Sequence, residues 1–145
     1  MTVKDYFSKY SQNYNEKRAK GIFGDLVNLI LVEKEKDLLI KKLNPSKNEI
    51  ILDAGCGSGL YSQIMVENGS KPLGIDISDG MIDQYKTLGM NGMVGNIESL
   101  SFNFKFDKVF CAGALEFVND PSKAIESFSK ILKHNGILVL LCQRL

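Results

Sequence analysis

The stretch EIILDAGCGSGLYS, residues 49–62, determines how the rest of the chain is interpreted. It begins with an apolar run, Ile50 to Leu52, that is typical of a buried strand, and it continues into three glycines that alternate with small residues. Such a turn has two interpretations. It is either a plain strand-to-helix turn or a backbone without side chains, against which a ligand can lie. The glycines alone leave both open.

The chain after this stretch alternates between strand-like and helix-like segments. Nearly continuous apolar strands that alternate with helices predict an α/β fold, a doubly wound parallel sheet of about five strands with helices on both faces. Ligands bind such sheets at the carboxyl ends of the strands. Asp79 is the expected N-cap of the helix at 79–89. We expect strands at 49–55, 71–77, 90–96, 106–113 and 136–142, and helices at 59–69, 79–89 and 120–136.

The length of 145 residues predicts a single domain with a sizeable core. We expect one domain over residues 1–145, made of an N-terminal helical segment (1–45) and an αβ core (46–145). Within the first segment, the pattern from Asp25 to Leu43 is amphipathic and predicts a helix. The sequence NPSKN at 44–48 should end that helix.

Composition disfavours several classes of partner. Lys and Arg total 18 and Asp and Glu total 17, so charge gives no reason to expect a nucleic acid or an anionic membrane as a partner. No apolar run approaches a membrane span, and the polar N-terminus lacks a signal-peptide core. Cys56, Cys111 and Cys142 are expected to be reduced and buried, which indicates a cytoplasmic protein. His134 has no metal-ligand spacing with them and is expected beside the last carbonyls of its helix.

Two carboxylates follow the first two strands. Asp76 ends the second strand, where it could accept hydrogen bonds from both hydroxyls of a ribose. Asp53 ends the first strand, where it could lie near a cationic group or cap loop amides, and both interpretations stay open. The turn has no Lys or Arg to favour a phosphate, so a nucleoside with a positively charged tail fits better. Leu60 stands where the dinucleotide fingerprint has its third glycine, which disfavours a nicotinamide dehydrogenase.

Five segments together resemble the class I S-adenosylmethionine-dependent methyltransferases in their order and spacing. The segment YSQNYNE also resembles the Tyr-containing N-terminal stretch of the small-molecule members. The resemblance implies a Rossmann-like fold, S-adenosylmethionine as cofactor, S-adenosylhomocysteine as product and a small-molecule acceptor. The five segments are ILDAGCGSG, GIDIS, GNIESLSF, FDKVFCAGALEFVNDP and ILKHNGILVLL.

The resemblance also implies a set of cofactor-binding residues. The glycines would lie against the methionine part with Asp53 near its amino group, Asp76 would hold the ribose, and Ile77 would pack on the adenine. Asn96 stands where many members have Asp, and its side-chain oxygen can still accept a bond from the adenine amino group. The implied set is Tyr14, Asp53, Gly55, Gly57, Gly59, Asp76, Ile77, Asn96, Ile97, Ala112 and Gly113.

Several of these positions keep a second interpretation. Ile77 could be ordinary core and Tyr14 could be helix-face packing. Leu115 and Glu116 would line the floor near the reacting methyl, although Glu116 could instead cap a loop. Phe117 occupies a position where many members carry His, which removes one candidate general base. No catalytic residue is therefore assigned.

The expected function is methyl transfer to an unidentified small molecule by direct displacement. The alternative is a methyltransferase-like module that binds the cofactor or its product without transfer and acts as a partner subunit. The family's sheet normally continues with two more strands beyond 136–142, so we expect this strand at or near an edge, poorly covered and able to pair with another chain. A truncated chain, a short subunit completed by association, and a binding protein all stay open. The sequence does not identify the acceptor or the atom methylated.

Overall fold

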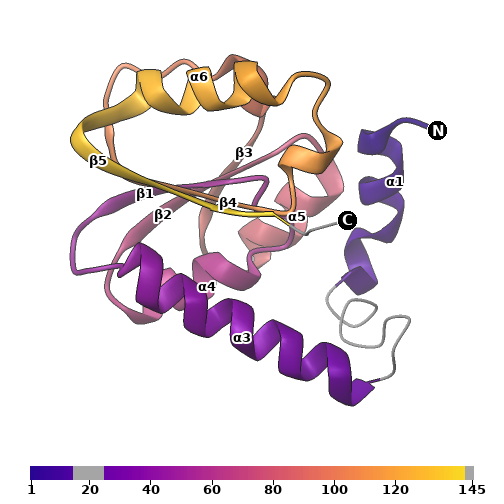
Figure 1. Ribbon diagram of the computed structural model, residues 1–145. Helices are drawn as coiled ribbons and strands as arrows, with labels where there is room; N and C mark the ends of the chain where they lie inside the picture. Colours follow the sequence, from indigo (N-terminus) through magenta and orange to yellow (C-terminus); the bar gives the residue numbers. More distant parts are fainter. Residues whose placement is uncertain (15–24, 143–145) are drawn as a thin grey trace.

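A single parallel sheet organises the molecule. The computed structural model describes residues 1–14 and 25–142, and its described part contains a five-stranded sheet in the order β3-β2-β1-β4-β5 (Figure 1). All four strand pairings are parallel. The doubly wound α/β fold predicted from the sequence is confirmed. The strands are β1 (Ile50–Ala54), β2 (Lys71–Asp76), β3 (Asn91–Val94), β4 (Phe106–Ala112) and β5 (Leu132–Leu141).

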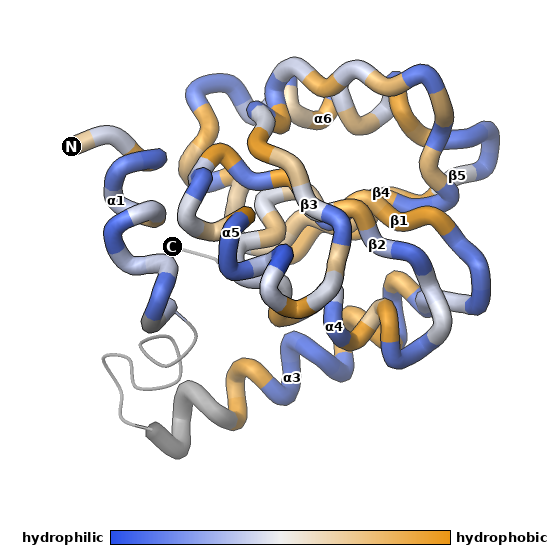
Figure 2. The backbone as a smooth tube through the Cα atoms, turned by 180° about the vertical axis from the view of Figure 1, so that it is seen from behind, coloured by the Kyte–Doolittle hydropathy of each residue, from blue (hydrophilic) through white to orange (hydrophobic). Residues whose placement is uncertain are grey.

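Helices cover both faces of this sheet. Helices α3 (Asp25–Leu43) and α4 (Leu60–Glu67) lie on one face, and α6 (Pro121–Ile131) lies on the other (Figure 1). Helix α5 (Asp79–Thr87) packs against β2 and β3. Helix α1 (Val3–Tyr10), continued by the short turn η1 (Ser11–Asn13), lies against α5, at the side of the sheet in both views (Figures 1 and 2).

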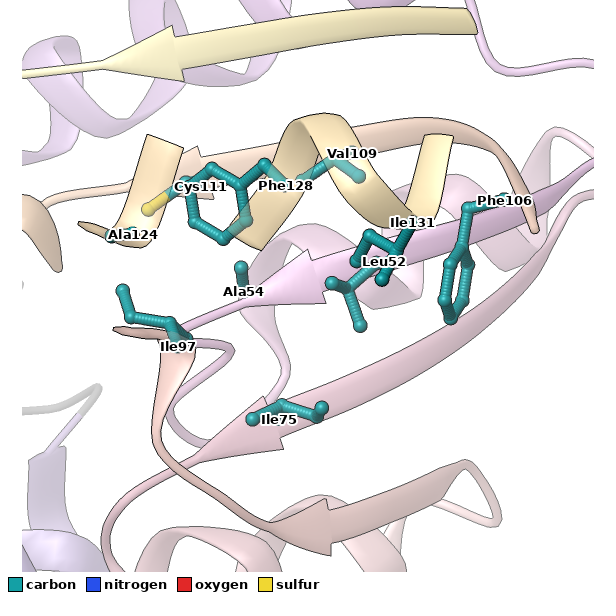
Figure 3. Packing of buried hydrophobic residues seen from close by; sticks show 10 residues of the cluster. All are labelled: Leu52, Ala54, Ile75, Ile97, Phe106, Val109, Cys111, Ala124, Phe128 and Ile131. Atoms are coloured by element: carbon teal, nitrogen blue, oxygen red, sulfur yellow. The ribbon is translucent and has the colours of Figure 1, made fainter. Parts of the chain in front are cut away.

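Strand β1 lies at the centre because its side chains are apolar on both faces. Leu52 and Ala54 belong to the cluster beneath α6, whereas Ile51 belongs to the cluster beneath α3 and α4. Each fully buried Leu or Ile contributes about 1.5–3 kcal/mol relative to an exposed position. Figure 3 shows the first cluster, in which the ring of Phe128 from α6 lies over the strands.

The N-cap of α5 and the junction between α6 and β5 differ from those predicted, whereas the other bounds agree within two residues. The N-cap of α5 is Ser78, whose side chain accepts a hydrogen bond from the N–H of Met81, and Asp79 is the first helical residue. Helix α6 ends at Ile131, and β5 already begins at the next residue. The chain can turn there because Asn135 adopts a positive φ of 63°.

The early start of β5 gives this strand an irregular register. Leu132 pairs with Phe106, and the next pair is Lys108 with Ile137, so the chain between them bulges out of the ladder. His134 lies in this bulge and is exposed, so its expected place beside the carbonyls of a helix end is wrong.

The cysteines are free, and two of the three are buried as predicted. Cys56 and Cys111 lie in the interior, whereas Cys142, expected to be buried, is exposed beyond the end of β5. Strand β5 is an edge strand of the described sheet, and its Ile137 side chain is 44% exposed. In the described ranges, no helix has the length and apolar character needed to cross a bilayer.

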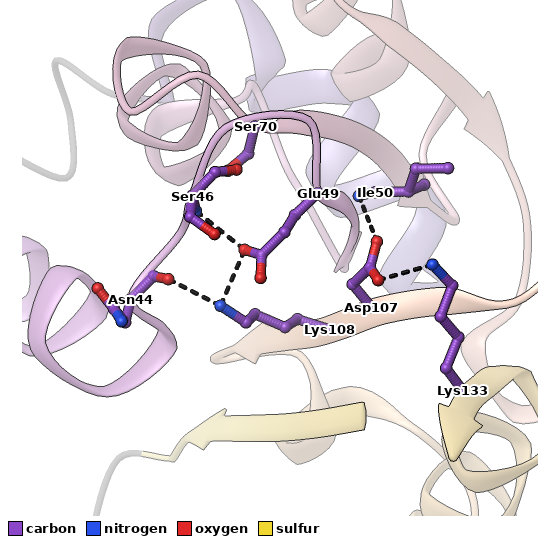
Figure 4. Close-up of polar contacts among 8 residues, drawn as sticks. All are labelled: Asn44, Ser46, Glu49, Ile50, Ser70, Asp107, Lys108 and Lys133. Carbon is purple, nitrogen blue, oxygen red and sulfur yellow. Dashed lines mark hydrogen bonds and ion pairs between the residues drawn. The ribbon is translucent and has the colours of Figure 1, made fainter. Parts of the chain in front are cut away.

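A polar cluster holds the amino-terminal ends of the strands. The ammonium of Lys108 on β4 donates to the carbonyl of Asn44 at 2.7 Å and to Glu49 at 2.8 Å. Asp107 accepts from the first N–H of β1 at 2.8 Å and from Lys133 of β5 at 2.6 Å (Figure 4). These contacts tie the end of α3 to β1, β4 and β5 at one edge of the molecule.

Candidate cofactor site

The candidate site is a cavity of about 400 Å³ at the carboxyl ends of the strands. The chain runs outward from β1 through β2 to β3 and then returns to β4 on the other side of β1, so the strand order reverses beside β1. A crevice at such a reversal is the expected binding place in an open α/β sheet. Nine of the eleven residues implied by the resemblance line this cavity: Tyr14, Gly55, Gly57, Asp76, Ile77, Asn96, Ile97, Ala112 and Gly113.

Asp76 is held firmly at the end of β2. One carboxylate oxygen accepts from the N–H of Gly57 and the other from the N–H of Ser78, each at 2.9 Å. Burial raises the pKa of Asp76, and these backbone hydrogen bonds partly offset the effect. Each oxygen keeps a second lone pair, so the carboxylate can still accept hydrogen bonds from a ligand.

The glycines differ in what a side chain at each position would meet. Gly57 has φ of +53° and a β-carbon there would meet open space, which is the geometry of a backbone cradle for a ligand. Gly113 after β4 has the same character, with φ of +65° and open space. At Gly55, by contrast, a β-carbon would lie 2.3 Å from the β-carbon of Ala114, so this glycine lets the β1 and β4 loops pack.

Gly59 and Asp53 do not line the cavity. A β-carbon on Gly59 would lie 2.6 Å from the Met90 side chain and 3.0 Å from the ring of Tyr85, so this glycine serves packing. Asp53 is 1% exposed and accepts a hydrogen bond from Ser62 at 2.7 Å. Burial is the main reason that its pKa rises to about 7. Its two interpretations, a place near a cationic group and a cap of loop amides, both stay predictions.

The residues after β3 form another wall. The side-chain oxygen of Asn96 accepts from the N–H of Glu98 at 2.9 Å, so one of its lone pairs is engaged and one stays open to a ligand. Ile97 is 6% exposed and contacts the core while lining the cavity. Ile77 after β2 is 41% exposed and lines the same cavity, so its interpretation as ordinary core is wrong.

Helix α1 supplies a wall that the sequence did not predict. Thr2, Val3, Lys4 and Phe7 line the cavity together with Tyr14. The capping box formed by Thr2 and Asp5 indicates where α1 begins, but no sequence signal tells against which element it packs.

The α1 wall meets the loop after β4. The ring of Phe7 lies edge-on to that of Phe117, with ring centres 5.3 Å apart, and Val118 and Asn119 continue the lining. Leu115 and Glu116, expected on the floor, do not line the cavity. Phe117 therefore supplies an apolar wall of the cavity, whereas the resemblance implied this place for Leu115 and Glu116.

Three contacts hold α1 on α5. Lys4 pairs with Asp79 at 2.8 Å, and the hydroxyls of Ser8 and Ser78 lie 2.9 Å apart. Gly80 allows the close approach, since a β-carbon there would lie 3.0 Å from the carbonyl oxygen of Ser8. Because the Ser78 N–H also holds Asp76, α1 is connected to the carboxylate at the centre of the site.

Comparison with solved structures shows the same fold. The YcgJ protein of Bacillus subtilis superposes with a TM-score of 0.70 at 23% identity, covering 74% of this chain and 50% of that one. Magnesium protoporphyrin IX methyltransferase of Synechocystis PCC 6803, solved with bound S-adenosylmethionine, superposes with a TM-score of 0.68 at 19% identity, covering 90% and 70%.

Curated relatives share more sequence. A ubiquinone biosynthesis O-methyltransferase of Pelagibacter ubique is 37% identical over 135 residues, covering 88% of this chain and 53% of its own length. The enzyme of the same name from Haemophilus ducreyi is 31% identical over 140 residues, covering 88% and 49%. The chain spans about half the length of these relatives. The family described as methyltransferase domain matches residues 52–140, which include the glycine turn, Asp76 and Asn96. The resemblance seen in the sequence is thus confirmed, and the chain belongs to the methyltransferase domain family.

Proposed function

We propose that the chain binds S-adenosylmethionine in this cavity and takes part in methyl transfer to a small-molecule acceptor by direct displacement. The observation that carries the proposal is Asp76, a carboxylate fixed by two backbone N–H groups at the wall of a cavity of about 400 Å³. Membership of the methyltransferase domain family supports it. A solved neighbour with the same fold, an amino pentose methyltransferase of Micromonospora echinaspora, carries bound S-adenosylmethionine.

The residues present suit this cofactor. Gly57 and Gly113 leave open space where side chains would otherwise project, and they line the cavity on either side of the crevice between β1 and β4. Asp76 offers its free lone pairs to the ribose hydroxyls, and Asn96 offers one to the adenine amino group. Ile77, exposed in the cavity, supplies an apolar surface for the adenine ring. Tyr14 and Ile97 complete the cofactor-binding set proposed here, with Gly55 and Ala112.

In direct displacement the acceptor atom would take the methyl group, S-adenosylhomocysteine would leave, and the proton of a hydroxyl or amine acceptor would pass to solvent, so alignment matters more than a protein base. S-adenosylmethionine supplies a methyl group already activated on a sulfonium, and alignment of nucleophile, carbon and sulfur can supply roughly 7–11 kcal/mol of the barrier. The walls of α1 and of the 117–119 loop are placed to exclude water and to orient an acceptor. The O-methyltransferase names of the relatives make a hydroxyl compound the first acceptor to test, with amines second.

Binding is tested first with S-adenosylhomocysteine by titration calorimetry. Replacing Asp76 by Ala should weaken binding by about 2–4 kcal/mol, because two ribose hydroxyls lose a charged acceptor in a partly desolvated site. The matched control is Asp83→Ala, which removes an exposed carboxylate from α5 outside the cavity and should leave the affinity unchanged.

Transfer is then tested by mass spectrometry with a panel of phenols and primary amines. A product heavier by one methyl group, formed with wild type and lost with Asp76→Ala, is the expected result. Equal affinity of wild type and Asp76→Ala for S-adenosylhomocysteine would remove Asp76 from the site and, with it, the proposed function.

A further inference from the structure

Tyr85 of α5 is inserted into a slot formed by three glycines. Its side chain is fully buried, and its ring lies where Gly59, Gly74 and Gly92 lack side chains. A β-carbon would lie 2.5 Å from the Tyr85 ring at Gly74, 2.8 Å at Gly92 and 3.0 Å at Gly59. The ring is therefore fixed between β2, β3 and the glycine turn, and its hydroxyl has one position.

That hydroxyl begins a buried chain of hydrogen bonds. Tyr85 donates to the hydroxyl of Ser62 at 2.7 Å, and Ser62 donates to the carboxylate of Asp53 at 2.7 Å. None of the three residues is more than 1% exposed. Because a carboxylate can only accept when it is ionised, the chain has one direction and favours the charged form of Asp53.

The carboxylate of Asp53 is buried near the end of β1, where the glycine turn begins. One residue separates it from Gly55, which lines the cavity. The titratable groups that face it are Asp76 on β2, Cys56 in the turn, Tyr85 on α5 and Cys111 on β4. None of these is a cation, and no ion pair among the described residues includes Asp53.

We propose that the Tyr85–Ser62–Asp53 chain keeps a negative charge near the glycine turn and thereby makes the site prefer the sulfonium cofactor over its thioether product. The inference rests on the proposed function of the same cavity. Tyr85 and Ser62 are positioning residues, because neither lines the cavity and both act through Asp53. The preference arises because the two ligands differ by one methyl group and one positive charge.

The preference should follow the ionisation of Asp53. Burial places the pKa of this carboxyl at about 7, so it is neutral below that pH and charged above it. Attraction of a cation in a partly desolvated site acts only on the charged form. The ratio of the two affinities should therefore rise as the pH rises through about 7. Loss of the Ser62 hydroxyl removes the hydrogen bond that favours the charged form, so the rise should move to higher pH.

The experiment measures the dissociation constants of S-adenosylmethionine and S-adenosylhomocysteine by calorimetry between about pH 5.5 and 8, a range that brackets the titration. For wild type, the preference for the sulfonium should increase at least about fivefold across this range. Ser62→Ala should shift the increase to higher pH, and Tyr85→Phe should shift it less in the same direction. Asp53→Asn should give a low ratio that does not change with pH.

Two control variants remove comparable groups elsewhere. Ser70→Ala removes a buried hydroxyl that bonds to the carbonyl of Ser46, and Tyr61→Phe removes the α4 hydroxyl that bonds to Glu35 of α3. Both should keep the wild-type pH profile. If Ser62→Ala fails to fold, the isosteric Asp53→Asn variant still decides the question.

The outcomes separate this inference from the function on which it rests. Tight binding of both ligands with a ratio that does not change with pH overturns the inference and leaves the proposed function standing. A pH-dependent ratio that Asp53→Asn retains also overturns it. Binding of neither ligand at any pH overturns both.

Discussion

Single residues of the glycine turn have separate tasks, although the sequence presents them as one motif. Gly57 leaves room for a ligand, Gly55 leaves room for Ala114, and Gly59 leaves room for Tyr85 and Met90. Only the first of these tasks concerns the cavity contents directly. The turn therefore fits both interpretations of the sequence. The missing side chains of Gly55 and Gly59 permit close packing, and that of Gly57 leaves space for a ligand.

Gly57 can be tested against a glycine of the same conformation elsewhere. Gly57→Ala and Gly89→Ala both place a side chain at a positive φ with open space around it, and each should cost about 1–2 kcal/mol of unfolding free energy. Only Gly57 lines the cavity, so only Gly57→Ala should weaken S-adenosylhomocysteine binding, by about tenfold or more. Thermal unfolding and calorimetry on both variants give the comparison. Equal affinities would show that Gly57 does not contact the ligand.

From the sequence, the positions of the site residues were predictable, whereas their contacts were not. Asp76, Asn96 and Gly57 follow directly from where strands end, and the cavity is found at those positions. The burial of Asp53 was not predictable, because it depends on Ser62 and on the slot occupied by Tyr85, which lies on another helix. Such contacts form between segments that are distant along the chain, and no local pattern records them.

Helix α1 differs from the sheet-packed helices in how it is attached to the molecule. It buries none of its own side chains, yet it supplies a wall of the cavity. It is held by one exposed ion pair, one hydroxyl pair, the close approach at Gly80 and the edge-on ring contact of Phe7 with Phe117. An exposed ion pair contributes little, typically below about 1 kcal/mol. The attachment of α1 is therefore weak by comparison with that of the sheet-packed helices.

Replacing Gly80 by Ala should disturb α1 without disturbing the core. The new β-carbon would lie 2.8 Å from the Ser11 hydroxyl and 3.0 Å from the Ser8 carbonyl oxygen, so α1 must move outward. S-adenosylhomocysteine affinity should fall about three- to tenfold, an effect typical of overpacking by one methyl group. The unfolding midpoint should stay equal or rise, because Ala favours a helix over Gly by up to about 1 kcal/mol.

The control for this change is Asp83→Ala, an exposed position on the same helix, which should leave the affinity unchanged. A Gly80→Ala protein that binds as tightly as wild type would show that the position of α1 does not matter to the ligand.

Element types were predictable and some boundaries were not. Asp79 looked like the cap of α5 because Asp is a good N-cap, but the preceding Ser78 performs that role and also faces Ser8. The pattern of α6 continues through Lys133 and His134, yet pairing of Leu132 with β4 ends the helix earlier. In both places a tertiary contact decided between two residues of similar local preference.

The two ends of the sheet have different roles in the molecule. The carboxyl ends of the strands form the cavity, while the amino ends are tied by Lys108, Glu49, Asp107 and Lys133 (Figure 4). Lys108 is nearly buried, and its ammonium satisfies both a carbonyl and a carboxylate. Stability and ligand binding should therefore respond to different substitutions.

Lys108→Ala should lower the unfolding free energy by about 2–4 kcal/mol, because Glu49 loses its cation and keeps only the hydrogen bond from the Ser46 N–H, and the Asn44 carbonyl loses the Lys108 ammonium as a donor. Lys133→Ala removes the half-exposed partner of Asp107 and should cost less than about 1 kcal/mol. Urea unfolding measures both. Neither variant should change S-adenosylhomocysteine affinity, and a change in affinity with Lys108→Ala would contradict the separation of the two ends.

The slot of Tyr85 also has a consequence for how such sequences can evolve. Gly59, Gly74 and Gly92 come from three different elements, and at each the Tyr85 ring lies where a side chain would begin, together with Met90 at Gly59 and Cys56 at Gly74. A larger residue at any of the three becomes tolerable only once the residue at 85 is smaller. Glycine should therefore be retained at these three positions among homologues wherever an aromatic residue stands at 85. The motif that marks the family thus owes part of its third glycine to a tyrosine 26 residues further along the chain.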